Sequence, residues 1–89
     1  MRRGGAGKKR DANEASIIQA LEAVGVKVWR VTGEGLPDLL CWFRGVWQPL
    51  EVKSAGGRLT EAQAKRFLET PFPIVRDVDQ ALAHFVRRR

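Results

Sequence analysis

The chain has very little cysteine and histidine, which excludes the common zinc sites. Among its 89 residues, Cys41 is the only thiol and His84 the only imidazole. Zinc sites in proteins are typically built from several such ligands, and a single cysteine cannot form a disulfide within the chain. We therefore expect no zinc centre and no internal disulfide. Cys41 is expected to be a small buried apolar residue, and His84 a surface or packing residue.

Long apolar runs are missing as well. No stretch approaches the roughly 20 apolar residues that a membrane-spanning helix requires. The basic N-terminal segment is followed by polar residues rather than by the apolar centre of a signal peptide. The sequence therefore predicts no membrane association and a cytoplasmic location.

Acidic residues are outnumbered by basic ones. The chain has 16 Lys and Arg against 10 Asp and Glu, a formal net charge of +6. This excess predicts a polyanionic partner, because Lys and Arg that neutralise phosphates release bound counterions. Residues 1–10 carry five basic residues and almost no apolar ones. We interpret them as a disordered basic arm, and residues 11–89 as a single small domain.

The apolar pattern predicts three helices and four strands. Residues 12–24 have apolar side chains at helical spacing and end at Gly25. Two more helices are expected, one between Thr60 and Pro71 and one at 77–86. Strands are expected at 26–31, 38–43, 46–53 and 73–76.

The resulting order, αβββαβα, predicts an α/β fold with a mixed four-stranded sheet flanked by helices. A helix that connects the third and fourth strands makes those two strands parallel and places the third strand inside the sheet. Pro49 lies in this third strand and cannot donate a hydrogen bond to a neighbouring strand. We therefore expect a bulge or a locally unpaired edge at Pro49.

The second and third strands are predicted to form a hairpin that brings two acids together. With Arg44-Gly45 as a two-residue turn, Asp38 faces Glu51, with Cβ atoms about 4.5–5.5 Å apart. Like charges in facing positions are destabilising unless a cation lies between them. Side chains alternate along a strand, so Lys53 lies on the same face as Glu51. Two carboxylates and one ammonium should therefore converge.

This combination of groups suits metal-assisted phosphodiester chemistry. Mg²⁺ prefers oxygen ligands, so Asp38 and Glu51 together with a backbone carbonyl could hold it. Lys53 could orient or help to deprotonate the attacking water and stabilise developing charge. The alternative is that Asp38 is a turn residue and that Glu51 and Lys53 are solvent-facing strand positions. Their joint placement on facing positions of one hairpin favours the site.

Two segments resemble a known nuclease family. Gly35-Leu36-Pro37-Asp38-Leu39 and Leu50-Glu51-Val52-Lys53-Ser54 resemble the PD and ExK motifs of the PD-(D/E)xK nucleases, in the form found in VRR-NUC domains. The family is also similar in having an upstream helical glutamate, here Glu14, and a Leu-x-x-x-Gln segment, here Leu59 to Gln63. The resemblance covers about residues 11–76.

The resemblance implies a stand-alone, phage-type VRR-NUC domain with a restriction-endonuclease-like core. It implies that Asp38 and Glu51 bind Mg²⁺ or Mn²⁺, that Glu14 is a further ligand directly or through water, and that the main-chain carbonyl of Val52 contributes. Lys53 would be the catalytic lysine and Gln63 would line the site. The implied activity is metal-dependent DNA endonuclease cleavage in the cytoplasm of a bacterial or phage-infected cell.

Several roles stay open at this stage. Glu14 extends the apolar stripe of the first helix and so could point toward the sheet, but Asp11 to Glu14 also matches a capping box. Gln63 matches the capping box that begins at Thr60. The tryptophans could stack on unpaired bases, although in so small a domain we favour a place in the core or a subunit interface. These tryptophans are Trp29, Trp42 and Trp47.

Two other functions compete with a DNA endonuclease. One is a noncatalytic DNA-binding module with a decayed site, which the joint presence of Asp38, Glu51 and Lys53 argues against. The other is a subunit similar to Holliday-junction resolvases, active as a homodimer on branched or flapped DNA. A homodimer is expected because a small core with three tryptophans leaves apolar surface to cover, and because branched DNA offers two related strands.

Overall fold

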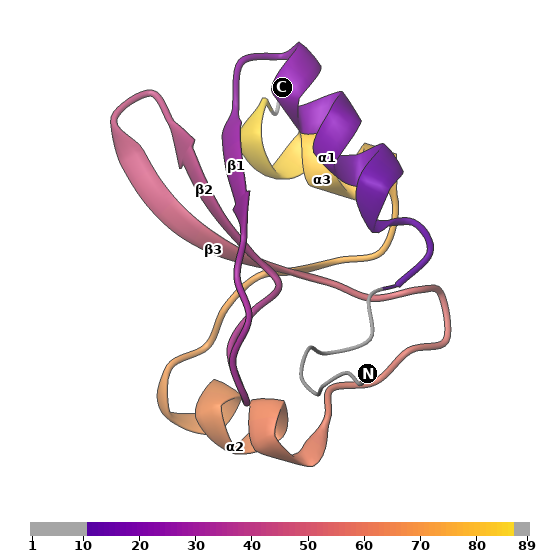
Figure 1. Cartoon of the computed structure of the whole chain (residues 1–89), viewed down its shortest axis with the longest axis vertical. Coiled ribbons are helices and arrows are strands. Elements are labelled where there is room, and N and C mark those ends of the chain that lie inside the picture. The colour runs from indigo at the N-terminus through magenta and orange to yellow at the C-terminus, as the bar shows by residue number, and fades with distance from the viewer. Residues whose placement is uncertain (1–10, 87–89) are drawn as a thin grey trace, which may run out of the picture.

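The computed structural model describes residues 11–86, and within them the elements follow the predicted order αβββαβα (Figure 1). The predicted basic arm, residues 1–10, and residues 87–89 lie outside the described part of the chain. The elements are α1 (Glu14–Ala23), β1 (Lys27–Arg30), β2 (Leu39–Phe43), β3 (Val46–Val52), α2 (Glu61–Glu69), β4 (Ile74–Val75) and α3 (Val78–Phe85).

The four strands form one mixed sheet in the order β1-β2-β3-β4. The first two pairings are antiparallel, and β3 and β4 are parallel. The predicted α/β class, mixed sheet and interior third strand are therefore confirmed. Helix α2 forms the crossover between β3 and β4, and it lies at the end of the sheet opposite the hairpin turn (Figure 1).

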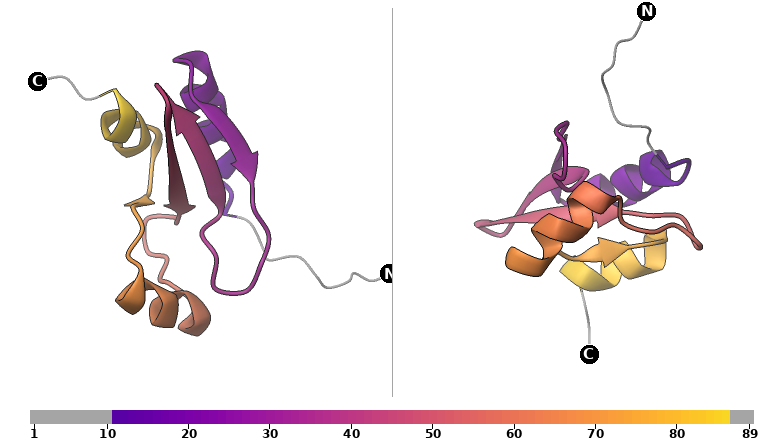
Figure 2. Two further views of the ribbon diagram at one scale, coloured as in Figure 1. Left: turned by 90° about the vertical axis from the view of Figure 1, so that its left-hand side faces the viewer. Right: turned by 90° about the horizontal axis from the view of Figure 1, so that it is seen from below.

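Helices α1 and α3 pack together and cover one face of the sheet. The left view of Figure 2 shows the broad side of the sheet with α1 behind it. Apolar side chains from the two helices and from this face form the core. Its buried members are Ile17, Leu21, Val26, Leu39, Cys41, Leu50, Val52, Val75 and Ala81.

Helix α1 begins at Glu14, two residues later than the predicted 12–24. Asn13 is its N-cap residue, and its side-chain Nδ2 donates to the main-chain oxygens of Lys53 (3.4 Å) and Arg76 (2.8 Å). These long-range contacts, invisible in a local pattern, hold the start of the helix against the sheet. The helix ends at Ala23, and Gly25, predicted to close it, follows the C-cap residue with φ of 98°.

The β2–β3 hairpin has the predicted turn and register. Arg44 (φ 53°) and Gly45 (φ 83°) both adopt positive φ, as a two-residue type I′ turn requires. The pairing then runs without interruption from Phe43 opposite Val46 to Leu39 opposite Leu50. The next step of this register places Asp38 opposite Glu51.

Pro49 sits in β3 without a bulge, directly opposite Leu40. The backbone N–H groups of Glu51 and Lys53 donate to Pro73 (2.9 Å) and Val75 (3.0 Å), on the β4 side of the strand. Because N–H directions alternate along a strand, the nitrogen of Pro49 faces the same side, before β4 begins. Of the two predicted solutions, the locally unpaired edge is confirmed, and no bulge is needed.

The predictions for the less common side chains had mixed outcomes. Cys41 is fully buried as predicted, and burial raises the pKa of its thiol to about 11, which keeps it neutral. Trp29 and Trp47, by contrast, are more than half exposed, so neither lies in the core, and the alternative place in a subunit interface stays a prediction. Within residues 11–86, no helix is long and apolar enough to cross a membrane.

Candidate active site

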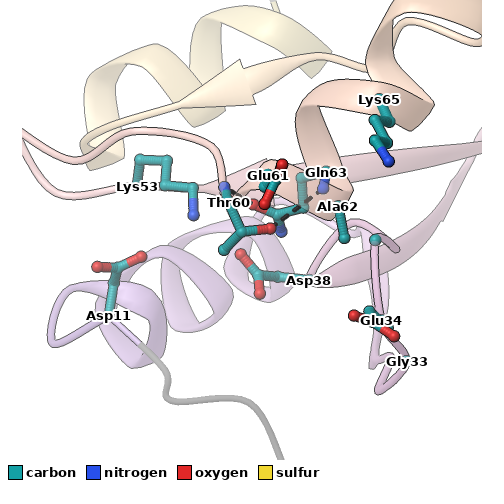
Figure 3. Close-up of a pocket in the computed structure, with 11 residues that line it drawn as sticks. Asp11, Gly33, Glu34, Asp38, Lys53, Thr60, Glu61, Ala62, Gln63 and Lys65 are labelled. Carbon is teal, nitrogen blue, oxygen red and sulfur yellow. Dashed lines mark hydrogen bonds between the residues drawn. The ribbon is translucent and has the colours of Figure 1, made fainter.

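A cleft of about 630 Å³ opens where β2 begins, β3 ends and α2 starts (Figure 3). Three of the predicted site residues line it, namely Asp38, Lys53 and Gln63. Asp38 immediately precedes β2, Lys53 immediately follows β3, and Gln63 lies in the first turn of α2. The cleft is also lined by Asp11, Gly33, Glu34, Gly35, Thr60, Glu61, Ala62 and Lys65.

The two acids predicted to face each other are held together by reciprocal backbone hydrogen bonds. The N–H of Asp38 donates to Oε1 of Glu51 at 3.0 Å, and the N–H of Val52 donates to Oδ2 of Asp38 at 2.9 Å. Asp38 is 5% exposed and Glu51 is 0% exposed. The hairpin therefore continues past its last paired residues through carboxylate contacts, which fix both side chains in a desolvated position.

Lys53 completes the predicted convergence. Its Nζ lies 3.1 Å from Oε2 of Glu51, and its side chain is 12% exposed. The same-face placement of Glu51 and Lys53 follows from strand alternation. One ammonium faces two carboxylates, so the cluster formed by Asp38, Glu51 and Lys53 has one more formal negative charge than positive.

Gln63 satisfies both of the interpretations that the sequence left open. Its backbone N–H donates to Oγ1 of Thr60 at 3.1 Å, and its Oε1 accepts from the Thr60 N–H at 3.0 Å, which is a complete capping box. Its Nε2 then donates to Oε2 of Glu51 at 2.9 Å and to the Leu36 carbonyl at 3.3 Å. The cap fixes the orientation of the amide, so the start of α2 positions the Glu51 carboxylate.

Gly35 allows α2 to approach this closely. It has φ of 79°, which an L side chain rarely adopts, and a Cβ built on it would lie 3.2 Å from the carbonyl oxygen of Ala62. Glycine therefore provides both the turn before Pro37 and the space for the first turn of α2. This gives the Gly-x-Pro-Asp segment a physical role in building the cleft.

The charge state of Glu51 is set by its surroundings. Burial raises the pKa of its carboxyl above the ordinary value, the neighbouring negative charge of Asp38 raises it further, and Lys53 acts in the opposite direction. A carboxyl that is costly to ionise and is held against a second carboxyl is typical of a site that gains from a bound cation.

This raised pKa gives a pH-dependence of stability that can be tested without metal. A folded-state pKa above the unfolded value means that the folded protein binds more protons between the ordinary value of 4.5 and the raised value. The contribution of Glu51 to stability is therefore present at low pH and is lost as the pH rises through its folded pKa. We therefore compare the unfolding free energies of the metal-free wild type and of Glu51→Gln at about pH 7.5 and about pH 5. The difference, wild type minus variant, should be larger at pH 5 than at pH 7.5.

The comparison with Glu51→Gln is needed because His84 acts in the opposite sense. Burial lowers the pKa of His84, so its contribution to stability increases with pH. Both proteins contain His84, and the difference between their urea-unfolding free energies at the two pH values isolates Glu51. Equal pH slopes for the two proteins would contradict the assigned environment of Glu51.

Glu14 is buried, with 2% exposure, as expected for an inward-pointing acid. Its Oε2 lies 3.6 Å from Nε of Arg30 on β1. The predicted alternative, a capping box based on Asp11, does not match the N-cap, which is Asn13. Within residues 11–86 there is no group of three or more His, Cys, Asp or Glu side chains placed to hold a metal. A ligand role for Glu14 therefore stays a prediction.

The carboxylates of Asp38 and Glu51 supply the kind of oxygen ligand that a hard divalent cation prefers. Mg²⁺ is often held by only one or two carboxylates, with water and substrate phosphates completing its coordination. An ionised carboxylate has about four lone-pair positions, and Glu51 uses three of them on the N–H of Asp38, Lys53 and Gln63. The carbonyl of Val52 remains a predicted ligand.

Two residues that hold the site in place were missed by the sequence analysis. Asn13 connects the start of α1 to Lys53, and Nη1 of Arg76 donates to the carbonyls of Ser54 (2.7 Å) and Gly57 (2.8 Å). Arg76 thereby anchors the loop between Lys53 and α2. Both contacts join distant parts of the chain, so no local spacing could have revealed them.

Neither a protein-family model, nor a curated protein, nor a solved structure matches this chain.

Proposed function

We propose that this chain is a divalent-metal-dependent nuclease that hydrolyses phosphodiester bonds in DNA. The observation that carries the proposal is the buried Asp38–Glu51 pair, with Lys53 in contact with Glu51, at the edge of a cleft of about 630 Å³. Motif resemblance to the VRR-NUC form of the PD-(D/E)xK nucleases supports the same activity. A noncatalytic module would have no need to keep two acids buried side by side, at a cost to stability.

The charge of the cleft supports a requirement for a metal. Its acidic lining residues are Asp11, Glu34, Asp38 and Glu61, whereas its basic ones are Lys53 and Lys65. A phosphate diester entering the cleft would meet net negative charge from the lining residues within 11–86. A divalent cation held by Asp38 and Glu51 would reverse the sign at the point where the scissile phosphate lies.

The residues of the chain would have distinct tasks in the hydrolysis. The water oxygen forms a bond to phosphorus, one ester P–O bond breaks, and the departing oxygen takes up a proton. When bound, Mg²⁺ or Mn²⁺ would polarise the phosphate and lower the pKa of water. Lys53 would orient the attacking water and stabilise the charge that develops on the phosphoryl oxygens. Gln63 would hold the Glu51 carboxylate in one orientation.

The proposal is tested by incubating the purified chain with supercoiled, single-stranded, flapped and four-way DNA, each with Mg²⁺, Mn²⁺ or EDTA. Cleavage products that require a divalent ion are expected. Binding without cleavage under all of these conditions would favour the noncatalytic module instead.

Removal of residues 1–10 tests the predicted arm. The segment carries five basic residues, and each one that neutralises a phosphate increases the salt dependence of binding by about one contact. We expect the truncated chain to bind DNA more weakly at low salt and with a flatter salt dependence. A titration of fluorescent duplex at several salt concentrations measures both, and an unchanged slope would show that the arm makes no phosphate contacts.

A further inference from the structure

The face of the sheet that α1 and α3 leave open carries a cluster of exposed apolar side chains. Trp29 is 51% exposed, Trp47 56% and Leu40 37%, and Pro49 is also exposed. The cross-strand register places these four residues and Trp42 on one face. We call this surface, formed by Trp29, Leu40, Trp42, Trp47 and Pro49, the tryptophan face.

The two most exposed rings lie against each other across the central strands. Trp29 is on β1 and Trp47 on β3, with β2 between them, yet their ring centroids are 5.3 Å apart with planes tilted by 38°. The rings therefore meet above β2 and support one another. Exposed indole rings that are held in place by contact with each other can stack on flat heterocycles such as nucleic-acid bases.

The tryptophan face is continuous with the candidate active site. Trp47, Pro49, Glu51 and Lys53 alternate with inward-facing residues along one chain segment, so they share a side of the sheet. Glu51 is four residue steps along the strand from Trp47, which is roughly 13 Å at about 3.3 Å per residue. Anything bound on the rings and extending along β3 would thus reach the cleft.

The charges near this path are of both signs. Lys27 is exposed, and it pairs across the sheet with Trp42, on the same face as the rings. Pro49 also lines a smaller cleft of about 250 Å³ that contains both Arg66 and Glu69. An occupant with flat aromatic rings fits the paired indoles of Trp29 and Trp47. Because this face runs on into the candidate active site, we take that occupant to be a strand of the proposed substrate.

We propose that the tryptophan face is a stacking platform for unpaired bases of a nucleic-acid strand whose backbone continues into the cleft. This proposal rests on the proposed nuclease function, and it assigns the substrate a single-stranded stretch beside the cut. Stacking on Trp29 and Trp47 is open only to bases whose faces are exposed, because a base within a duplex is already stacked on its neighbours. Flapped, branched or single-stranded DNA would be preferred to an intact duplex.

The test separates stacking from apolar contact by two matched double variants. Trp29→Leu with Trp47→Leu keeps apolar side chains but removes the π-faces, and Trp29→Phe with Trp47→Phe keeps both. Leu68→Ala is the control, because Leu68 is an apolar side chain that is 85% exposed and belongs to α2 rather than to the sheet. Fluorescence anisotropy with a labelled oligothymidylate and a labelled duplex, both in EDTA, measures affinity without cleavage.

We expect the leucine variant to lose roughly tenfold in oligothymidylate affinity for each ring removed. The phenylalanine variant should keep most of the affinity, and Leu68→Ala and all duplex affinities should be unchanged. Wild-type oligothymidylate affinity in the leucine variant, or an equal loss on duplex, would overturn the platform.

The competing occupant, a second copy of the chain, is tested with the same proteins. If wild type sediments as a dimer without nucleic acid and the leucine variant sediments as a monomer, this face is a subunit interface and the proposal is overturned. Cleavage assays with Mg²⁺ keep the two proposals apart. Ring-dependent strand binding without cleavage would reject the nuclease only, whereas cleavage with ring-independent binding would reject the platform only.

Discussion

Lys53→Ala is expected to abolish detectable cleavage of supercoiled DNA in Mg²⁺. The variant removes the only ammonium that contacts the Asp38–Glu51 pair within residues 11–86, at 3.1 Å from Glu51. Loss of one group that stabilises transition-state charge typically lowers turnover by about 10²–10³-fold, and loss of the group that orients the water adds to this. A time course of plasmid nicking over a range of enzyme concentrations measures the effect.

The same substitution has a structural consequence that must be measured separately. Without Lys53, the buried carboxyl of Glu51 loses the positive charge that favours its ionised form, so the variant should be less stable at neutral pH. Metal binding by this variant should be retained, because Lys53 supplies no metal ligand. Circular dichroism and melting curves establish the fraction of folded protein at the assay temperature.

Lys65→Ala is the matched control for Lys53→Ala. Lys65 lines the same cleft from α2 and is exposed, so its removal changes the charge of the cleft equally but leaves Glu51 untouched. We expect Lys65→Ala to cleave within a few-fold of wild type, the modest effect of one exposed charge. Cleavage by folded Lys53→Ala at the wild-type rate would remove the assignment of Lys53.

Asp38→Asn is expected to stabilise the metal-free protein and to remove most of the stabilisation that metal gives to wild type. In the wild-type protein, the negative charge of Asp38 raises the pKa of Glu51, so ionising both acids destabilises the metal-free fold. Asparagine keeps an oxygen that can accept the Val52 N–H, as Oδ2 of Asp38 does at 2.9 Å. The variant should therefore melt at a higher temperature than wild type in EDTA near pH 7.5.

Metal should affect the two proteins differently. A ligand at a hundred times its dissociation constant stabilises the folded state by about 2.7 kcal/mol, which in a domain of this size raises the melting temperature by on the order of 10 °C. Wild type should show this increase with Mg²⁺ or Mn²⁺. Asp38→Asn should lose most of it, because one of the two carboxylates is gone.

Glu22→Gln provides the control for removing an acid elsewhere. Glu22 is exposed on α1, so its amide should leave both the metal-free melting temperature and the metal-induced increase close to wild type. Differential scanning calorimetry of the three proteins with EDTA or divalent ions measures all of these quantities. Equal metal-induced increases in wild type and Asp38→Asn would show that the two acids do not share a cation.

The hairpin and its pair of acids were accessible from the sequence because they depend on local rules. A two-residue turn with Gly45 sets the register, and alternation then determines which side chains share a face. From those two rules alone, Asp38 faces Glu51, and Lys53 lies beside Glu51. Helix α2 and its cap at Thr60 were equally local, since N-cap chemistry involves residues three apart.

What the tertiary structure decided are the contacts between distant segments and the degree of burial. A local pattern could not choose between the two roles of Gln63, because the choice depends on where α2 packs, and the packing of Gly35 against Ala62 lets the amide fill both. Burial of Glu51, which raises its pKa, likewise comes from the elements around it rather than from its neighbours in the chain.

For the tryptophans too, the sequence and the tertiary structure determined different properties. Their strand positions followed from the sequence, but alternation does not say which face of a sheet the helices will cover. By itself, the sequence determined the strand register and the identity of the facing residues. Trp29 and Trp47 stay exposed only because α1 and α3 pack on the opposite face of the sheet. Apolar area is removed from water only where another element packs against it.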